Sequence, residues 1–211
     1  MIRFTILGIS VQVDPWFWIT MAFIGGGMNA GSSLEVMLVL VFVFAGFLSI
    51  LLHELGHAWM IRHYGLPTAI TLQAFGGYAT YPSGQLSRRQ SFIVTAAGPG
   101  IQFVFGVLLI GLGVVLPIPE GSLFLPFLSD LIWVSIVWSI LNCVPVFPLD
   151  GGQMLAAVLG SSKQHHVHLI STIVAVLIGL FAYLSLNTLL LPIFMGLFAW
   201  QNWQAYRQTS R

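Results

Sequence analysis

The chain has 211 residues, of which 57% are hydrophobic and only 6% are charged, and its formal net charge is +1. Soluble domains carry about 25% charged residues, so this composition excludes a soluble protein and indicates one that lies in a membrane. The small net charge gives no support for nucleic-acid binding, and the single cysteine, Cys143, excludes an internal disulfide.

The N-terminal residues, "MIRFTILGISVQVDP", alternate between apolar and polar types and predict a short strand followed by a turn. They lack the charged and apolar regions of an export signal, so we expect the mature chain to begin at or near Met1. Asp14 followed by Pro15 predicts the start of a helix, because aspartate caps a helix and proline suits its first position. A first apolar span then runs to about residue 27.

A long apolar helix is predicted next, from about Leu34 to Arg62. Ser32 and Glu35 have the spacing of a capping box, which marks its beginning. At about 1.5 Å per residue this helix is longer than a bilayer core, so its last turns should emerge or bend. Residues 70–82, "ITLQAFGGYATYP", are rich in β-prone residues and glycine, and they predict a membrane-associated β-hairpin or edge strand.

Four further apolar spans are predicted at about residues 91–116, 127–147, 167–185 and 188–205. The expected fold class is an all-α polytopic membrane protein with about six transmembrane helices, together with the short N-terminal strand and the hairpin. In the third span, Gly98, Pro99 and Gly100 should allow a close approach of helices and a kink.

The charged residues predict an orientation in the membrane. Six alternating spans put Glu35 and Glu120 on one side and all the basic residues on the other, namely Arg3, Arg62, Arg88, Arg89, Lys163, Arg207 and Arg211. The positive-inside rule assigns the basic side to the cytoplasm. We therefore expect both chain ends on the cytoplasmic side of a bacterial-type cell membrane.

His53, Glu54 and His57 lie within the long span, in the sequence "HELGH". Residues four apart share one face of a helix, so the two histidines can bind one metal ion, with Glu54 beside them as a general base. H-E-x-x-H is the zincin pattern, and two imidazoles suit zinc. The alternative is a pair of helix-packing histidines with a glutamate partner, but a carboxylate inside a membrane is costly and is usually functional.

A catalytic zinc usually takes three protein ligands, so a third ligand is needed. His63 has the metzincin spacing, but that motif requires a glycine where Met60 stands. On an unbroken helix His63 lies about 120° around the axis from His57. The histidines of "HHVH", residues 165–168, lie next to Lys163 at a predicted membrane boundary and favour a solvated or headgroup-facing cluster.

Asp150, in "LNCVPVFPLDGG", is the better candidate for the third ligand. Pro145 and Pro148 should end the fourth span, and the two glycines after Asp150 favour an unwound turn. Such backbone at membrane depth is tolerated only where it is buried in protein or lines a water-filled cavity. Asp150 could instead be only the N-cap of the next helix. However, Asp150 and His57 are both expected near the cytoplasmic face, where they could share one zinc ion.

These motifs resemble those of the site-2 protease family of intramembrane zinc metalloproteases. "HELGH" matches the H-E-x-x-H helix of that family, and "NCVPVFPLDGG" matches its N-x-x-P-x-x-P-L-D-G element, with Cys143 where an apolar residue is commoner. The segments "ILGISVQVDPWFWI", "FGGYA" and "AAGPG" are also similar to family features. The resemblance thus covers most of residues 4–152.

The resemblance implies one domain over residues 1–211, with a catalytic core of about residues 4–160 and additional helices at about 165–205. It implies one Zn²⁺ per chain, held by His53, His57 and Asp150, with Glu54 as the catalytic base. It also implies that Asn142 is a polar group near the substrate or its oxyanion. A helix-packing hydrogen bond is the alternative for Asn142.

The implied function is hydrolysis of peptide bonds within or next to the transmembrane segments of single-span membrane proteins. A transmembrane helix hides its peptide bonds, so the substrate must be partly unwound. The free edge of the hairpin, with Gly76 and Gly77, could bind it as an added strand, or the hairpin could only plug the entrance. The alternative functions are a transporter that binds ions with the same side chains and a catalytically silent family member. The identity of the substrate and the oligomeric state are not predicted.

Overall fold

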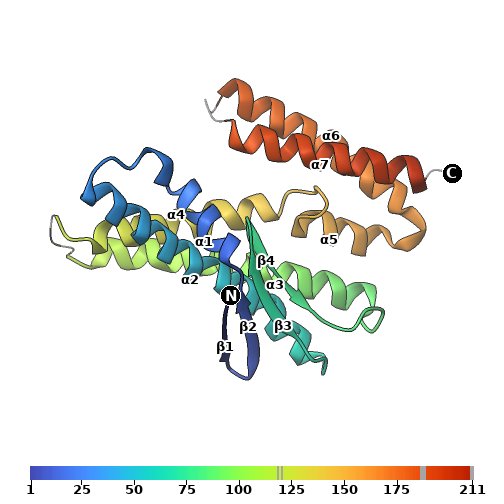
Figure 1. Cartoon of the computed structure of the whole chain (residues 1–211). Helices are drawn as coiled ribbons and strands as arrows, with labels where there is room; N and C mark the ends of the chain where they lie inside the picture. Colours follow the sequence, from blue (N-terminus) through green and yellow to red (C-terminus); the bar gives the residue numbers. More distant parts are fainter. Residues whose placement is uncertain (118, 120, 186–188, 210–211) are drawn as a thin grey trace. The chain divides into compact units, whose positions relative to one another are not determined.

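The computed structural model describes residues 1–117, 119, 121–185 and 189–209 (Figure 1). These residues form two compact units, each with its own apolar core. The first unit comprises Met1–Gln85 and Ala97–Ile140, and the second comprises Leu86–Ala96 and the chain from Leu141 onward. The expected single domain over residues 1–211 stays a prediction.

The first unit contains a four-stranded sheet in the order β1-β2-β3-β4 (Figure 1). Its strands are β1 (Ile2–Ile6), β2 (Ile9–Val13), β3 (Ala69–Gln73) and β4 (Gly76–Thr80). The two hairpins, β1-β2 and β3-β4, are antiparallel, and β2 pairs with β3 in parallel. The hairpin predicted at residues 70–82 is therefore confirmed, and β4 is an end strand of this sheet.

The N-terminal region forms two strands rather than the single short strand that was expected, so the all-α expectation needs correction to a mostly helical fold with a mixed sheet. The turn between β1 and β2 consists of Leu7 and Gly8, which have φ values of 51° and 75°. Such two-residue turns usually carry asparagine or glycine at both positions. A leucine in the first position removes that signal from the sequence.

Helices α1 (Pro15–Ile24) and α2 (Ser33–His63) begin directly after the capping residues that the sequence predicted for them. The Asp14 side chain accepts a hydrogen bond from the Trp16 amide at 2.9 Å. The Ser32 hydroxyl accepts from the Glu35 amide at 3.2 Å, while a Glu35 oxygen accepts from the Ser32 amide at 3.0 Å. The α1 helix ends earlier than the predicted residue 27, and its 10 residues span about 15 Å. A short 3-10 helix, η1 (Gly27–Asn29), follows α1.

Helices α3 (Arg88–Val115) and α4 (Phe124–Asn142) follow the sheet. The predicted close approach of helices occurs between α2 and α3, where a Cβ added to Gly56 would lie 2.7 Å from the Ala97 carbonyl oxygen. Helix α4 ends before the predicted residue 147, because Pro145 disfavours helical backbone at the residue that precedes it.

The second unit is helical and ends in a hairpin of two long helices. It contains α5 (Asp150–Leu159), the 3-10 helix η2 (Ser161–Lys163), α6 (Gln164–Ser185) and α7 (Leu190–Thr209). Helices α6 and α7 lie side by side along most of their lengths (Figure 1). Residue 188, the expected start of the sixth span, lies outside the described residues.

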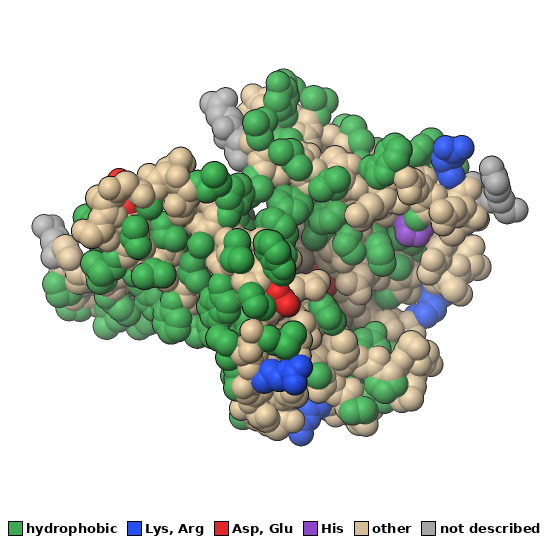
Figure 2. All heavy atoms as spheres, in the orientation of Figure 1, with side chains coloured by type: hydrophobic (Ala, Val, Ile, Leu, Met, Phe, Trp, Pro, Cys, Tyr) green, Lys and Arg blue, Asp and Glu red, His purple; other side chains and the backbone are tan. Residues whose placement is uncertain are grey.

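Four of the described helical segments are long and apolar enough to cross a membrane, namely Ser33–His63, Arg88–Val115, Phe124–Asn142 and Ser161–Ser185. Figure 2 shows that hydrophobic side chains cover much of the visible helical surface, with few Lys and Arg side chains. Large side chains such as Leu108, Leu177 and Phe181 are more than half exposed, which suits contact with lipid rather than water.

Candidate metal centre

His53 and His57 lie one turn apart on α2 in the first unit, and both side chains are buried. Their Nε2 atoms are 3.0 Å apart, and their rings are inclined by 76°. Two histidine nitrogens bound to a tetrahedral zinc at its usual bond lengths would lie about 3.3 Å apart. This spacing of the two rings is therefore compatible with the binding of one ion by both histidines.

A buried network of polar side chains connects His53 to helices α3 and α4. The Gln102 Oε1 atom lies 2.8 Å from His53 Nδ1, and Gln102 Nε2 donates to the Ser49 hydroxyl at 2.9 Å. The Ser49 and Ser135 hydroxyl oxygens are 2.8 Å apart. A carbonyl oxygen can only accept, so Nδ1 of His53 carries the proton and Nε2 is the unprotonated nitrogen of this ring.

Sequence reasoning missed Gln102, Ser49 and Ser135. The signal that could have found them is their polarity within apolar spans, because polar side chains inside a membrane bundle usually bind one another across helices. Their partners could not have been assigned, since Gln102 and His53 are 49 positions apart in the chain.

Gly98 of α3 faces His57. A Cβ added to Gly98 would lie 2.2 Å from His57 Nε2, whereas a Cβ added to Gly100 would have no atom within 4 Å. The close approach predicted from "AAGPG" thus depends on Gly98 and not on Gly100. The absence of a side chain at Gly98 leaves room for the Nε2 edge of the imidazole.

Glu54 is buried with an exposed fraction of 3%, and it faces strand β4. A Cβ added to Gly77 would lie 2.8 Å from Glu54 Cγ and 3.0 Å from its Cδ. Gly76, by contrast, has open space where its Cβ would be. The hairpin therefore packs on Glu54 through Gly77.

Asp150 is the first residue of α5 in the second unit and is buried. Leu149 is the N-cap residue, so the alternative that Asp150 only caps this helix is wrong. A Cβ added to Gly151 would lie 2.2 Å from the Val144 carbonyl oxygen. The glycine at this position therefore lets the preceding loop pack on the first turn of α5. Asn142, the last residue of α4, is half-buried, and its assigned role stays a prediction.

Comparisons with known proteins identify the family of the chain. The model of peptidase family M50 matches residues 41–120 and 118–186 of the chain. The chain belongs to peptidase family M50. Over 199 aligned residues, this M50 chain is 31% identical to a zinc metalloprotease of Methanocaldococcus jannaschii, with 89% of the chain and 55% of the relative covered. The M50 chain thus spans about half the length of that curated relative.

A solved structure, the site-2 protease from Methanocaldococcus jannaschii, is similar to the M50 chain with a TM-score of 0.68 and 26% identity. The similarity covers 97% of the M50 chain and 94% of that structure's chain. The M50 chain has the site-2 protease fold. With four helices in the described residues that are long and apolar enough to cross a membrane, it is an integral multi-pass membrane protein.

The donor set of the M50 chain is compatible with a zinc site. His53, His57 and Asp150 are all buried, and each side chain offers one ligand atom. Two imidazoles and one carboxylate form a common ligand set of catalytic zinc sites in peptidases. His63, by contrast, is exposed at the end of α2, and His168 is hydrogen-bonded to Asn202 at 2.9 Å.

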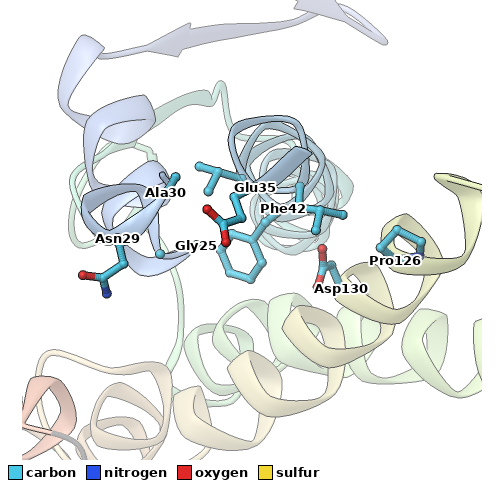
Figure 3. Close-up of a pocket in the computed structure, with 10 residues that line it drawn as sticks. Gly25, Asn29, Ala30, Glu35, Phe42, Pro126 and Asp130 are labelled. Carbon is cyan, nitrogen blue, oxygen red and sulfur yellow. The ribbon is translucent and has the colours of Figure 1, made fainter. Parts of the chain in front are cut away.

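A cavity of about 410 Å³ lies near the other end of α2 and is lined by residues that include Gly25, Asn29, Glu35, Phe42 and Asp130 (Figure 3). Glu35 lies about 27 Å from His53 along the axis of α2, at a rise of 1.5 Å per residue. One Glu35 oxygen accepts hydrogen bonds from the amides of Gly31 and Ser32, so this carboxylate serves the start of α2. The cavity is therefore separate from the candidate metal centre.

Proposed function

We propose that this M50 chain is an intramembrane zinc metalloprotease that hydrolyses peptide bonds within or next to transmembrane segments. The observation that carries the proposal is the buried His53–His57 pair, with its Nε2 atoms 3.0 Å apart and Nδ1 of His53 bound to Gln102. With Nδ1 of His53 protonated, Nε2 of that ring is the nitrogen that can bind a metal ion, and His57 Nε2 lies beside it. The names of the relatives, a zinc metalloprotease and a site-2 protease, support the same function.

In this proposal His53, His57 and Asp150 hold one Zn²⁺, as the resemblance in the motifs implies. Bound zinc would polarise the scissile carbonyl group and lower the pKa of a water molecule toward neutrality. Gln102 keeps the His53 ring in the tautomer that can bind the ion. The glycine at position 98 keeps space open beside His57.

Glu54 is the proposed general base. Its carboxylate takes the proton from the attacking water and then returns it to the leaving amine. Glu54 neighbours His53 on α2 and packs against Gly77 of β4, which supports a role beside the proposed substrate-binding edge. We assign Asn142 to the substrate or its oxyanion on the basis of the family motif alone.

Strand β4 is the proposed substrate-binding edge. A two-residue loop joins Gln73 to Gly76, and in such a hairpin the closing pair exchanges hydrogen bonds. The alternation along an antiparallel ladder then directs the backbone N–H and C=O groups of Gly77 and Ala79 away from β3. An unwound, single-span membrane protein could add a strand there, which would bring its peptide bonds next to Glu54.

We also propose six crossings, with both chain ends in the cytoplasm. Helix α1 is too short to cross alone. However, a Cβ added to Gly46 of α2 would meet Met21, and one added to Gly25 would meet Phe42, so residues 14–32 run along the first half of α2 toward its start. This course supports a first crossing over residues 14–32, and α7 would complete the sixth. The count leaves all seven basic residues of the chain on one side.

The test compares two variants of the purified chain, by zinc content and by cleavage of a single-span membrane protein. Glu54→Gln should keep about one zinc per chain and lose cleavage, because only the proton acceptor is removed. Asp150→Ala should lose both zinc and cleavage. Cleavage by Glu54→Gln would exclude the mechanism. A zinc-loaded, unmodified chain that cleaves no such substrate would indicate a catalytically silent family member.

A further inference from the structure

Side chains from both C-terminal helices form hydrogen bonds with the loop that precedes Asp150. The Phe147 amide donates a hydrogen bond to the Ser171 hydroxyl of α6 at 3.0 Å. The Phe147 carbonyl oxygen accepts a hydrogen bond from Asn202 Nδ2 of α7 at 2.5 Å. Both backbone groups of one loop residue are thus bound by side chains that lie far away in the sequence.

Burial and further hydrogen bonds restrain the two side chains that bind this loop. Ser171 is fully buried, and Asn202 has an exposed fraction of only 2%. Asn202 Nδ2 also donates to the Phe198 carbonyl oxygen at 2.8 Å, and its Oδ1 lies 2.9 Å from His168 Nδ1. Because Asn202 is bonded at both ends of its amide, it has one orientation.

Apolar contacts hold the same loop. Val146 is fully buried in the core of the second unit, in a cluster with Ala175 of α6 and with Met195 and Ala199 of α7. Interior side chains are close-packed, so the α6–α7 hairpin determines where this loop residue can lie. The hairpin therefore fixes the loop at two successive positions, by packing at Val146 and by hydrogen bonds at Phe147.

The loop and the start of α5 are tightly joined. A Cβ added to Gly152 would lie 2.3 Å from the Phe147 amide nitrogen, so the first turn of α5 packs directly on Phe147. The Leu149 amide donates to the Val146 carbonyl oxygen at 2.8 Å, and Gln153 Nε2 donates to the Pro148 carbonyl oxygen at 3.2 Å. A shift of Phe147 would therefore move Asp150.

We propose that Ser171 and Asn202 are positioning residues for Asp150, so that the α6–α7 hairpin determines where the carboxylate ligand of the zinc site lies. The proposal rests on the proposed function, in which Asp150 is a ligand. Neither residue is expected to contact the metal or the substrate. If their only role were to satisfy the irregular backbone of the loop, their removal would lower stability and leave metal binding unchanged.

The test uses Co²⁺ in place of zinc, in the full chain purified in detergent micelles. Three quantities are measured, namely the Co²⁺ dissociation constant, the visible absorption band of the bound ion and the melting temperature. Ser171→Ala and Asn202→Leu should each weaken Co²⁺ binding about tenfold, a size typical of residues that orient metal ligands, and should shift the band. Asn202→Leu keeps the number and branching of the side-chain heavy atoms while it removes the amide.

Matched controls come from the neighbouring residues. The Thr172 hydroxyl donates within its own helix to the His168 carbonyl oxygen at 2.8 Å, and Gln201 is exposed on α7. Thr172→Ala and Gln201→Ala should bind Co²⁺ as the unmodified chain does. If Asn202→Leu does not fold, Ser171→Ala alone decides the result.

Asp150→Ala separates the two proposals. If it leaves Co²⁺ affinity and the band unchanged, Asp150 is not a ligand, and both the proposed ligand set and this inference fail. If Asp150→Ala changes them while Ser171→Ala and Asn202→Leu do not, the ligand set stands and the positioning role is overturned. The same conclusion follows if the two variants lower only the melting temperature.

Discussion

An alanine in place of Gly98 should strongly weaken zinc binding, whereas an alanine in place of Gly100 should not. The added Cβ at position 98 would lie 2.2 Å from His57 Nε2, 2.4 Å from its Cε1 and 2.8 Å from its Cδ2. Carbon and nitrogen atoms in ordinary contact are about 3.5 Å apart, so the ring would have to move by roughly 1 Å. The atom most affected, Nε2, is the one that would bind the metal.

The size of the effect follows from how narrow the range of zinc bond lengths is. A functional zinc site keeps each ligand within about 0.2 Å of its ideal distance, so a displacement of about 1 Å removes His57 as a ligand. We expect the zinc dissociation constant of Gly98→Ala to rise at least about 100-fold, which corresponds to about 2.7 kcal/mol. Gly100→Ala should bind zinc normally, because its added Cβ has no atom within 4 Å.

The assay is competition for zinc between each purified variant and a chromophoric chelator, with zinc per chain measured by elemental analysis. Thermal unfolding serves as the control for folding. Both substitutions raise helix propensity by up to about 1 kcal/mol, so a general effect of alanine on α3 would appear in both variants. Normal zinc affinity in Gly98→Ala would refute the view that Gly98 makes room for the metal-binding edge of His57.

Three further predictions concern the other parts of the site and the helix that carries it. Gln102→Leu removes the acceptor of His53 Nδ1 and should weaken zinc binding about 10- to 100-fold in the same competition assay; an unchanged affinity would show that His53 needs no such partner. Ala79→Pro removes an outward N–H of β4 without disturbing the pairing with β3, so a cleavage assay should register loss of activity at full zinc content, and undiminished cleavage would contradict strand addition. Ser32→Ala removes the cap of α2 and should lower the free energy of unfolding by about 1 kcal/mol, with zinc content unchanged because the cap is far from the histidines.

Several features could be predicted because they depend only on neighbouring residues. His53 and His57 face the same way because of the helical repeat, and the capping box of Ser32 and Glu35 closes within one turn. The hairpin of β3 and β4 follows from β-prone residues around a glycine-rich turn. By contrast, the β1-β2 turn was not predictable, since Leu7 at positive φ is stabilised by the surrounding sheet rather than by its own preference.

The sequence by itself determined that the chain crosses a membrane, where its long helices lie, and that two histidines and a glutamate share one stretch of helix. Only the tertiary structure decided what surrounds them. The contacts of Gln102 with His53, of Gly98 with His57 and of Asn202 with the Asp150 loop each join residues more than 40 positions apart. Helical periodicity acts over a few residues, whereas such contacts depend on the packing of whole helices, which no local pattern specifies.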